Sequence, residues 1–196
     1  MAKIHISGFP GSGKTTLGEK LAKEFKKNVY IVETDGFIQH HTKEGKQLLK
    51  IQKQIGNRKE VEAEYNKKWR DILTEKIKDS FDETKAPIVI LVGSLDNFSL
   101  NGKLFWPQVD YKFLLKVELP ELLRRYYTRL CEKNLPVNFW KNVAKTNYSI
   151  TGSEEIVKSV QKYNSLHIQH KYQYKTDVEI LAAITQLVKK SNLISS

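Results

Sequence analysis

A glycine-rich segment near the N-terminus has the residue types and the spacing of a phosphate-binding loop. Residues 8–15 read Gly-Phe-Pro-Gly-Ser-Gly-Lys-Thr, which satisfies the pattern G-x-x-x-x-G-K-[ST]. Glycines let such a loop curl so that successive backbone N–H groups point at phosphate oxygens, and a helix that begins there adds the positive end of its dipole. The sequence therefore predicts a nucleotide site made of Gly8, Gly11, Ser12, Gly13, Lys14, Thr15 and Thr16.

Two side chains of this loop suit a complex of magnesium with a triphosphate. Lys14 can reach the β and γ phosphates as a point charge, and the Thr15 hydroxyl can ligate Mg²⁺. The sequence contains no Asn-Lys-x-Asp segment of the kind that selects guanine. We therefore expect ATP and Mg²⁺ rather than GTP.

Asp35 is a second candidate for chemistry, because it closely follows the apolar run at residues 29–32. The carboxyl ends of strands in a parallel sheet form the edge where ligands gather. At that edge Asp35 could accept the proton of an attacking hydroxyl or hold the water shell of magnesium. Because Gly36 follows, the same two residues also fit a plain turn.

The elements that must position these groups alternate between strands and helices. Apolar runs and alternation predict strands at residues 2–7, 29–32, 87–93 and 111–117, with a weaker one at 170–174. Helical spacing predicts helices from residue 15, along the second half of 40–81, over 121–131 and after 177. This alternation indicates an α/β fold with a parallel sheet.

Composition limits the classes of protein that the chain can belong to. Its 196 residues, 40% hydrophobic and 28% charged, fit one domain over 1–196 and exclude collagen or a disordered chain. No apolar run is long enough to span a membrane, no secretion signal is visible, and Cys131 has no cysteine to pair with. We therefore expect a cytoplasmic protein.

The formal net charge of +11 implies anionic partners such as nucleotides, phosphorylated metabolites or nucleic acid. Lysines that merely form a solvated face are the plainer explanation.

The loop and Asp35 together resemble the small-molecule kinases of the P-loop superfamily, among them nucleoside, nucleoside monophosphate, shikimate, gluconate and uridine kinases and the kinase half of polynucleotide kinases. In these proteins a Gly-x-x-Gly-x-Gly-Lys-[Ser/Thr]-Thr loop precedes a strand that ends in Asp, here residues 8–16 and 31–35. The resemblance implies a three-layer P-loop kinase fold with a central, flavodoxin-like, five-stranded parallel sheet and helices on both faces. It also implies transfer of the ATP γ-phosphoryl group to a small acceptor, a nucleoside or nucleoside monophosphate first, with Asp35 as general base or metal organiser.

The same resemblance gives a role to the segment 122–129, which holds three of the five arginines of the chain. Similar kinases carry lid arginines here that close over the transferring phosphoryl group. This implies catalytic roles for Arg125 and Arg129, which lie four residues apart on one helical face, and a nucleotide contact for Arg124, within a lid-like segment at about 124–145. A solvated helix face remains the alternative.

The acceptor site is less well marked. A helical insertion at about 38–82 occupies the place of the acceptor-binding region in similar kinases. The segment 93–97, Gly-Ser-Leu-Asp-Asn, differs from the corresponding segments of adenylate, shikimate and uridine kinases. Its Asp96 could be a displaced metal-binding carboxylate or an ordinary loop residue. Thr176 or Asp177 lies at the start of the last helix. We interpret this residue first as a helix cap and second as a contact to the nucleotide base.

Two other functions remain open at this point. The charge and the aromatic residues Trp69, Trp106 and Trp140 suit a nucleic-acid 5′-end kinase or another basic nucleic-acid processing factor. An NTP-hydrolysing switch without an acceptor is the third, because no acidic residue ends the strand at 87–93.

Overall fold

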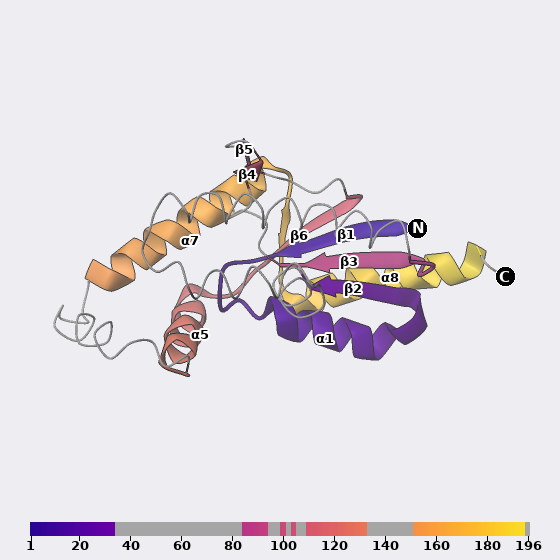
Figure 1. Ribbon diagram of the computed structural model, residues 1–196, viewed down its shortest axis with the longest axis horizontal. Helices are drawn as coiled ribbons and strands as arrows, with labels where there is room; N and C mark the ends of the chain where they lie inside the picture. The colour runs from indigo at the N-terminus through magenta and orange to yellow at the C-terminus, as the bar shows by residue number, and fades with distance from the viewer. Residues whose placement is uncertain (34–83, 94–98, 101–102, 105–108, 133–150, 195–196) are drawn as a thin grey trace, which may run out of the picture.

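The computed structural model describes residues 1–33, 84–93, 99–100, 103–104, 109–132 and 151–194. The strands are β1 (Ala2–Ser7), β2 (Val29–Glu33), β3 (Ile88–Val92), β4 (Ser99–Leu100), β5 (Lys103–Leu104), β6 (Tyr111–Leu115) and β7 (Gln173–Lys175). The helices are α1 (Lys14–Phe25), the short 3₁₀ helix η1 (Lys26–Asn28), α5 (Leu119–Glu132), α7 (Thr151–Gln169) and α8 (Asp177–Ile194). These elements confirm the predicted alternation of strands and helices (Figure 1).

Five strands form one parallel sheet in the order β2-β3-β1-β6-β7, and β4 and β5 form a separate antiparallel pair. The parallel five-stranded sheet is as expected, but the flavodoxin-like order is wrong, because β3 lies between β2 and β1. Burial explains this order. All five residues of β3 are buried, whereas β2 has the exposed Tyr30 and suits an edge position.

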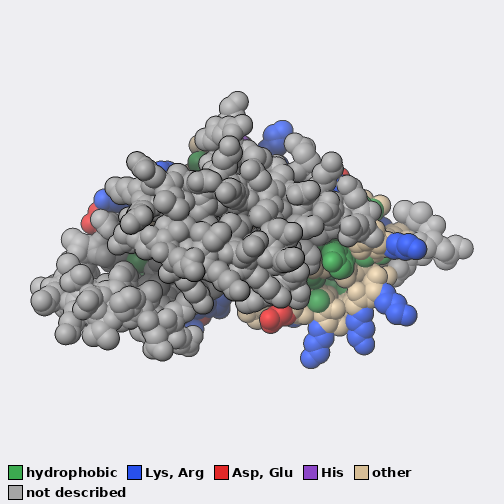
Figure 2. Space-filling view, viewed as in Figure 1, with side chains coloured by type: hydrophobic (Ala, Val, Ile, Leu, Met, Phe, Trp, Pro, Cys, Tyr) green, Lys and Arg blue, Asp and Glu red, His purple; other side chains and the backbone are tan. Residues whose placement is uncertain are grey.

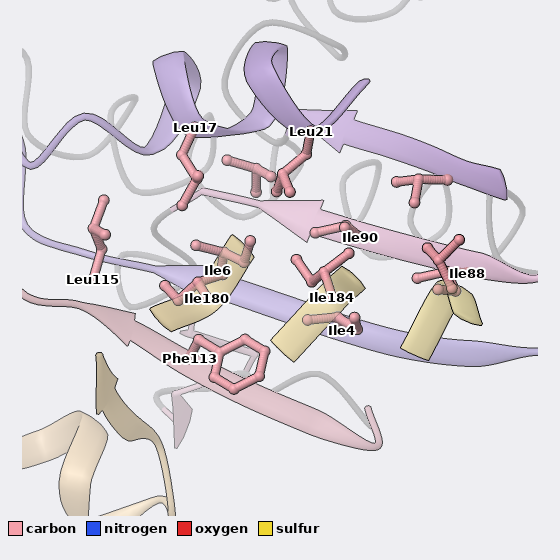
Figure 3. Close-up of a cluster of buried hydrophobic side chains, with 13 residues drawn as sticks. Ile4, Ile6, Leu17, Leu21, Ile88, Ile90, Phe113, Leu115, Ile180 and Ile184 are labelled. Carbon is pink, nitrogen blue, oxygen red and sulfur yellow. The ribbon is translucent and has the colours of Figure 1, made fainter. Parts of the chain in front are cut away.

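One face of the sheet packs against α1 and α8. The even-numbered residues of β1, Ile4 and Ile6, point to this side together with Ile90 of β3 and Phe113 of β6 (Figure 3). Leu17 and Leu21 of α1 and Ile180 and Ile184 of α8 fill the space above them. Each such side chain contributes about 1.5–3 kcal/mol when fully buried, so this cluster holds the two helices on the sheet.

The opposite face packs against α7. His5 and Ser7 of β1 alternate with Ile4 and Ile6 and point to this side, where Ser7 meets the buried side chains of Tyr163 and His167 on α7 and His5 meets Tyr172. The sheet is therefore covered on both faces, which confirms the three-layer fold. Helix α7 was not among the helices predicted from the sequence.

The last helix has the expected cap. The Thr176 hydroxyl accepts from the Glu179 N–H at 3.3 Å, and the Glu179 carboxylate accepts from the Thr176 N–H at 2.8 Å. This reciprocal pair is a capping box, so the first role predicted for Thr176 is confirmed. Across the described helices, no segment is both long and apolar enough to cross a membrane.

Several sequence expectations fall outside the described residues. They are Asp35, Asp96, the insertion at 38–82 with its helices, the three tryptophans, and the part of the lid-like segment at 133–145.

Candidate functional site

The glycine-rich loop joins β1 to α1 at the carboxyl edge of the sheet. Its turn is closed by a hydrogen bond from the Ser12 N–H to the Phe9 carbonyl at 3.0 Å. Gly13 caps α1 with a φ of 92°, in the left-handed region that favours glycine. A Cβ on Gly8 would lie 2.5 Å from Ser12 Oγ and 3.3 Å from Leu115 Cβ, so the loop leaves no room for a side chain there.

The Lys14 side chain folds back over this loop. Its ammonium group donates to the Gly8 carbonyl at 2.6 Å and to the Phe9 carbonyl at 3.3 Å. The positive charge is thereby held against the loop at the N-terminal end of α1, where the helix dipole adds to it.

The hydroxyl groups of the loop differ in exposure. Thr15 and Thr16 are exposed in the first turn of α1. The backbone of the loop at Gly11 is half-buried and has a φ of 88°. The Ser12 hydroxyl is buried and has no hydrogen-bond partner among the described residues. A buried hydroxyl without a partner costs free energy, which a bound phosphate oxygen would recover.

Helix α5 brings an arginine to the loop. Nη1 of Arg125 lies 3.5 Å from the Ser12 carbonyl oxygen, and a Cβ on Gly13 would lie 3.4 Å from the same nitrogen. The structure therefore brings Arg125 to the same loop that the Lys14 ammonium contacts. The side chain of Arg129 lies outside the part that the structure describes.

Glu121, one turn before Arg125, binds both neighbouring arginines. Its carboxylate accepts from Nε of Arg125 at 2.6 Å and from Nε and Nη2 of Arg124 at 2.7 and 2.8 Å. These hydrogen bonds, first with Arg124 and then with Arg125, lower the pKa of Glu121 to about 2. The carboxylate therefore stays charged at neutral pH and steadies the guanidinium of Arg125.

Glu33, the last residue of β2, is a candidate that sequence reasoning did not assign. The register aligns Glu33 with Val92 of β3 and Val92 with Ile6 of β1, so Glu33 is level with the end of β1. A Cβ on Gly18 of α1 would lie 3.3 Å from Val92 and 3.6 Å from Ile31, so α1 packs closely on this face of β2 and β3. Glu33 lies two residues beyond Ile31, on the same face of the strand, toward the end where α1 begins.

The carboxylate of Glu33 has an unusual environment. Its Oε1 atom is buried and has no hydrogen-bond partner among the described residues. A buried carboxylate oxygen needs a hydrogen-bond donor or a cation, and Mg²⁺ prefers oxygen ligands and keeps several waters. Glu33 and Thr15 therefore fit a magnesium ion held with few protein ligands. The sequence did hold a signal for this residue, because Glu33 is an acidic side chain directly after the apolar run at residues 29–32.

A network of buried polar side chains lies behind the loop. Ser7 Oγ lies 2.7 Å from the Tyr163 hydroxyl and 2.8 Å from His167 Nε2, and the Tyr163 hydroxyl donates to the Gly8 carbonyl at 3.1 Å. Burial lowers the pKa of His167 to about 4, so this imidazole is neutral at neutral pH. Ser7 is fully buried, so the Ser7–His167 pair has no access to a substrate.

A second part of this network anchors the end of β3. His5 Nε2 donates to the Gly93 carbonyl at 3.0 Å, and His5 Nδ1 accepts from the Tyr172 hydroxyl. Burial is the main cause that lowers the pKa of His5 to about 3. Sequence reasoning missed this network, although Ile156, Val160, Tyr163 and His167 have helical spacing.

Comparisons with known proteins agree with this architecture. The family model described as AAA domain matches residues 4–139. The shikimate kinase from Acinetobacter baumannii in complex with shikimate is similar in structure, with a TM-score of 0.56, 16% identity, and 98% of this chain and 96% of that chain covered. The shikimate kinase from Bacteroides thetaiotaomicron has a TM-score of 0.55 and 20% identity, with 100% and 99% covered. No match was found among curated proteins.

Proposed function

Because this chain belongs to the AAA domain family and has the fold of the P-loop small-molecule kinases, we propose that it is an ATP-dependent phosphotransferase that acts on a small acceptor. The main observation behind the proposal is that two cationic side chains contact the same loop. The side chain of Lys14, the first residue of α1, reaches back to the Gly8 carbonyl, and Arg125 reaches the Ser12 carbonyl from α5. A loop that only binds phosphates does not need the second cation, whereas phosphoryl transfer develops charge that an arginine stabilises.

The roles follow from charge and position. The loop N–H groups, Lys14 and the Ser12 hydroxyl bind the phosphates, while Arg125, with Arg129 and secondarily Arg124, faces the transferring group. Asp35 accepts the proton of the acceptor hydroxyl. The hydroxyl oxygen then bonds to the γ-phosphorus while the bond from phosphorus to the β,γ-bridging oxygen breaks, and ADP leaves.

Thr15 and Glu33 are the described residues that would hold magnesium, and Asp35 is the further candidate. When bound, Mg²⁺ would neutralise charge on the β and γ phosphate oxygens. The buried, unpartnered oxygen of Glu33 supports this assignment.

We propose a nucleoside or nucleoside monophosphate as the first acceptor class, bound by the insertion at 38–82. The two similar solved structures are named as shikimate kinases, and one is in complex with shikimate. Hydroxylated carboxylic acids are therefore the second class of acceptor that we propose.

A nucleic-acid 5′-end is a further candidate acceptor because of the net charge of +11. Figure 2 shows basic side chains projecting near α1 and η1, whose exposed lysines are Lys20, Lys23, Lys26 and Lys27. Such a surface would give oligonucleotide binding with a steep salt dependence.

The test is a coupled ADP-release assay with ATP and Mg²⁺ against nucleosides, nucleoside monophosphates, shikimate, gluconate and 5′-hydroxyl oligonucleotides, with Lys14→Ala as control. One acceptor that raises ADP release far above background would support the proposal and name its class. Slow, Lys14-dependent hydrolysis that no acceptor raises would indicate the NTP-hydrolysing switch instead. With an active acceptor, full activity of Asp35→Asn would contradict the role of Asp35 as base.

A further inference from the structure

Tyr163 on α7 contacts the first two residues of the phosphate loop. Its hydroxyl donates to the Gly8 carbonyl at 3.1 Å, and its ring meets the Phe9 ring edge to face, with 5.7 Å between centroids and 89° between planes. The Phe9 carbonyl in turn accepts from the Ser12 N–H, which closes the turn of the loop. Tyr163 therefore holds the segment on which the shape of the loop depends.

The buried partners of Tyr163 fix the direction of its hydroxyl hydrogen. His167 Nδ1 lies 2.9 Å from the Tyr163 carbonyl oxygen, which can only accept, so Nδ1 carries the hydrogen. His167 Nε2 is then the acceptor for the single hydrogen of Ser7 Oγ. Ser7 must therefore accept from Tyr163, and the Tyr163 hydrogen is directed between Ser7 Oγ and the Gly8 carbonyl.

The Gly8 carbonyl also accepts from Lys14, at 2.6 Å. A carbonyl oxygen has two acceptor positions, so both donors can bind it together. A nucleotide would draw the Lys14 ammonium toward its phosphates, while the Tyr163 hydroxyl, buried behind the loop, would keep its place.

We propose that Tyr163 is a positioning residue of the phosphate loop, oriented by Ser7 and His167, that holds Gly8 and Phe9 in the phosphate-binding shape while Lys14 moves to the nucleotide. The inference rests on the proposed function only in taking a nucleotide as the ligand of the loop.

Tyr163→Phe tests this with the loss of one oxygen, and Tyr172→Phe is the matched control. Both tyrosines are buried, at 8% and 4% exposed, and both hydroxyls bond a side chain of β1, but Tyr172 bonds His5 rather than the loop. Loss of one hydrogen bond to the loop should weaken binding of ADP and ATP with Mg²⁺ by about threefold to tenfold in Tyr163→Phe. Tyr172→Phe should change it by less than about twofold. Isothermal titration calorimetry measures both.

Hydrogen exchange gives a second readout that needs no nucleotide. The amides of residues 8, 9 and 11–14 should exchange faster in ligand-free Tyr163→Phe than in the unmodified protein, and at the unmodified rate in Tyr172→Phe. Equal weakening of nucleotide binding in both variants, or unchanged loop exchange in Tyr163→Phe, would overturn the proposal. If the unmodified protein bound no nucleotide, the proposed function would fail, and the exchange comparison would still decide the role of Tyr163.

Discussion

The ammonium nitrogen of Lys14 lies 2.6 Å from the carbonyl oxygen of Gly8, at the other end of the same loop. The Lys14 side chain that should bind phosphate thus contacts the backbone of the phosphate loop itself. Arg125 approaches the same loop at Ser12 from a different helix. The two cations reach one loop from separate parts of the chain, and this arrangement leads to predictions that distinguish neighbouring residues.

Arg125→Ala should lower the rate of phosphoryl transfer more than Arg124→Ala. Arg125 lies 3.5 Å from the loop, and the loss of one charged donor at a transferring group costs about 10²–10³ in rate. Steady-state kinetics with the active acceptor measures this.

Arg124→Ala is the matched control for this comparison, because both arginines pair with Glu121. Both ion pairs are exposed to solvent, so neither change should lower the stability of the fold measurably. Equal losses of rate in the two variants would contradict the special role of Arg125.

Glu33→Gln should raise the Mg²⁺ concentration needed for half-maximal activity by about tenfold or more. The reason is that its buried carboxylate oxygen lacks a partner among the described residues and lies at the edge where α1 begins. Titration of Mg²⁺ at saturating ATP measures this change.

Glu24→Gln removes the same charge from an exposed position of α1 and should leave the Mg²⁺ requirement unchanged. An unchanged requirement in Glu33→Gln would remove Glu33 from the proposed magnesium site.

The stability of the protein should fall as the pH falls below about 6.5. Burial lowers the pKa of His5 to about 3 and of His167 to about 4, while the unfolded chain binds these protons near pH 6.5. The unfolded state therefore takes up more protons between pH 6.5 and about 4, and each histidine should reduce the free energy of unfolding by about 1.4 kcal/mol per pH unit.

His167→Gln isolates the contribution of one histidine. Urea unfolding at several pH values between 7.5 and 5 should show a pH dependence smaller by about one proton than in the unmodified chain. The same pH dependence in both proteins would mean that His167 already takes up its proton in the folded state.

Much of the fold could be predicted because the central strands are strongly apolar. The continuous run at 87–93 predicted β3, and the alternation at 2–7 predicted β1 with the bounds that the structure has. The order of the strands could not be predicted in the same way, because it depends on which strand buries the most apolar surface when it has a neighbour on each side. The full burial of β3 and the exposed Tyr30 of β2 decide this only once the sheet is assembled.

The buried network shows a different limit of sequence reasoning. His5 and Ser7 alternate with Ile4 and Ile6, a pattern typical of a strand with one solvated face. Both are instead buried, where Ser7 bonds Tyr163 and His167 of α7 and His5 bonds Tyr172, which follows α7. Those partners lie more than 150 residues away in sequence, so their pairing with β1 requires the folded structure. The phosphate loop, by contrast, is local, and its spacing alone predicted it.

The most direct test of the proposed phosphotransferase activity is to follow the γ-phosphoryl group of radiolabelled ATP in the presence of Mg²⁺ and the candidate acceptors. The proposed activity requires that the label appear on an acceptor hydroxyl with the unmodified protein and that Lys14→Ala abolish this transfer. Label that appears only in inorganic phosphate, whatever acceptor is present, would contradict it.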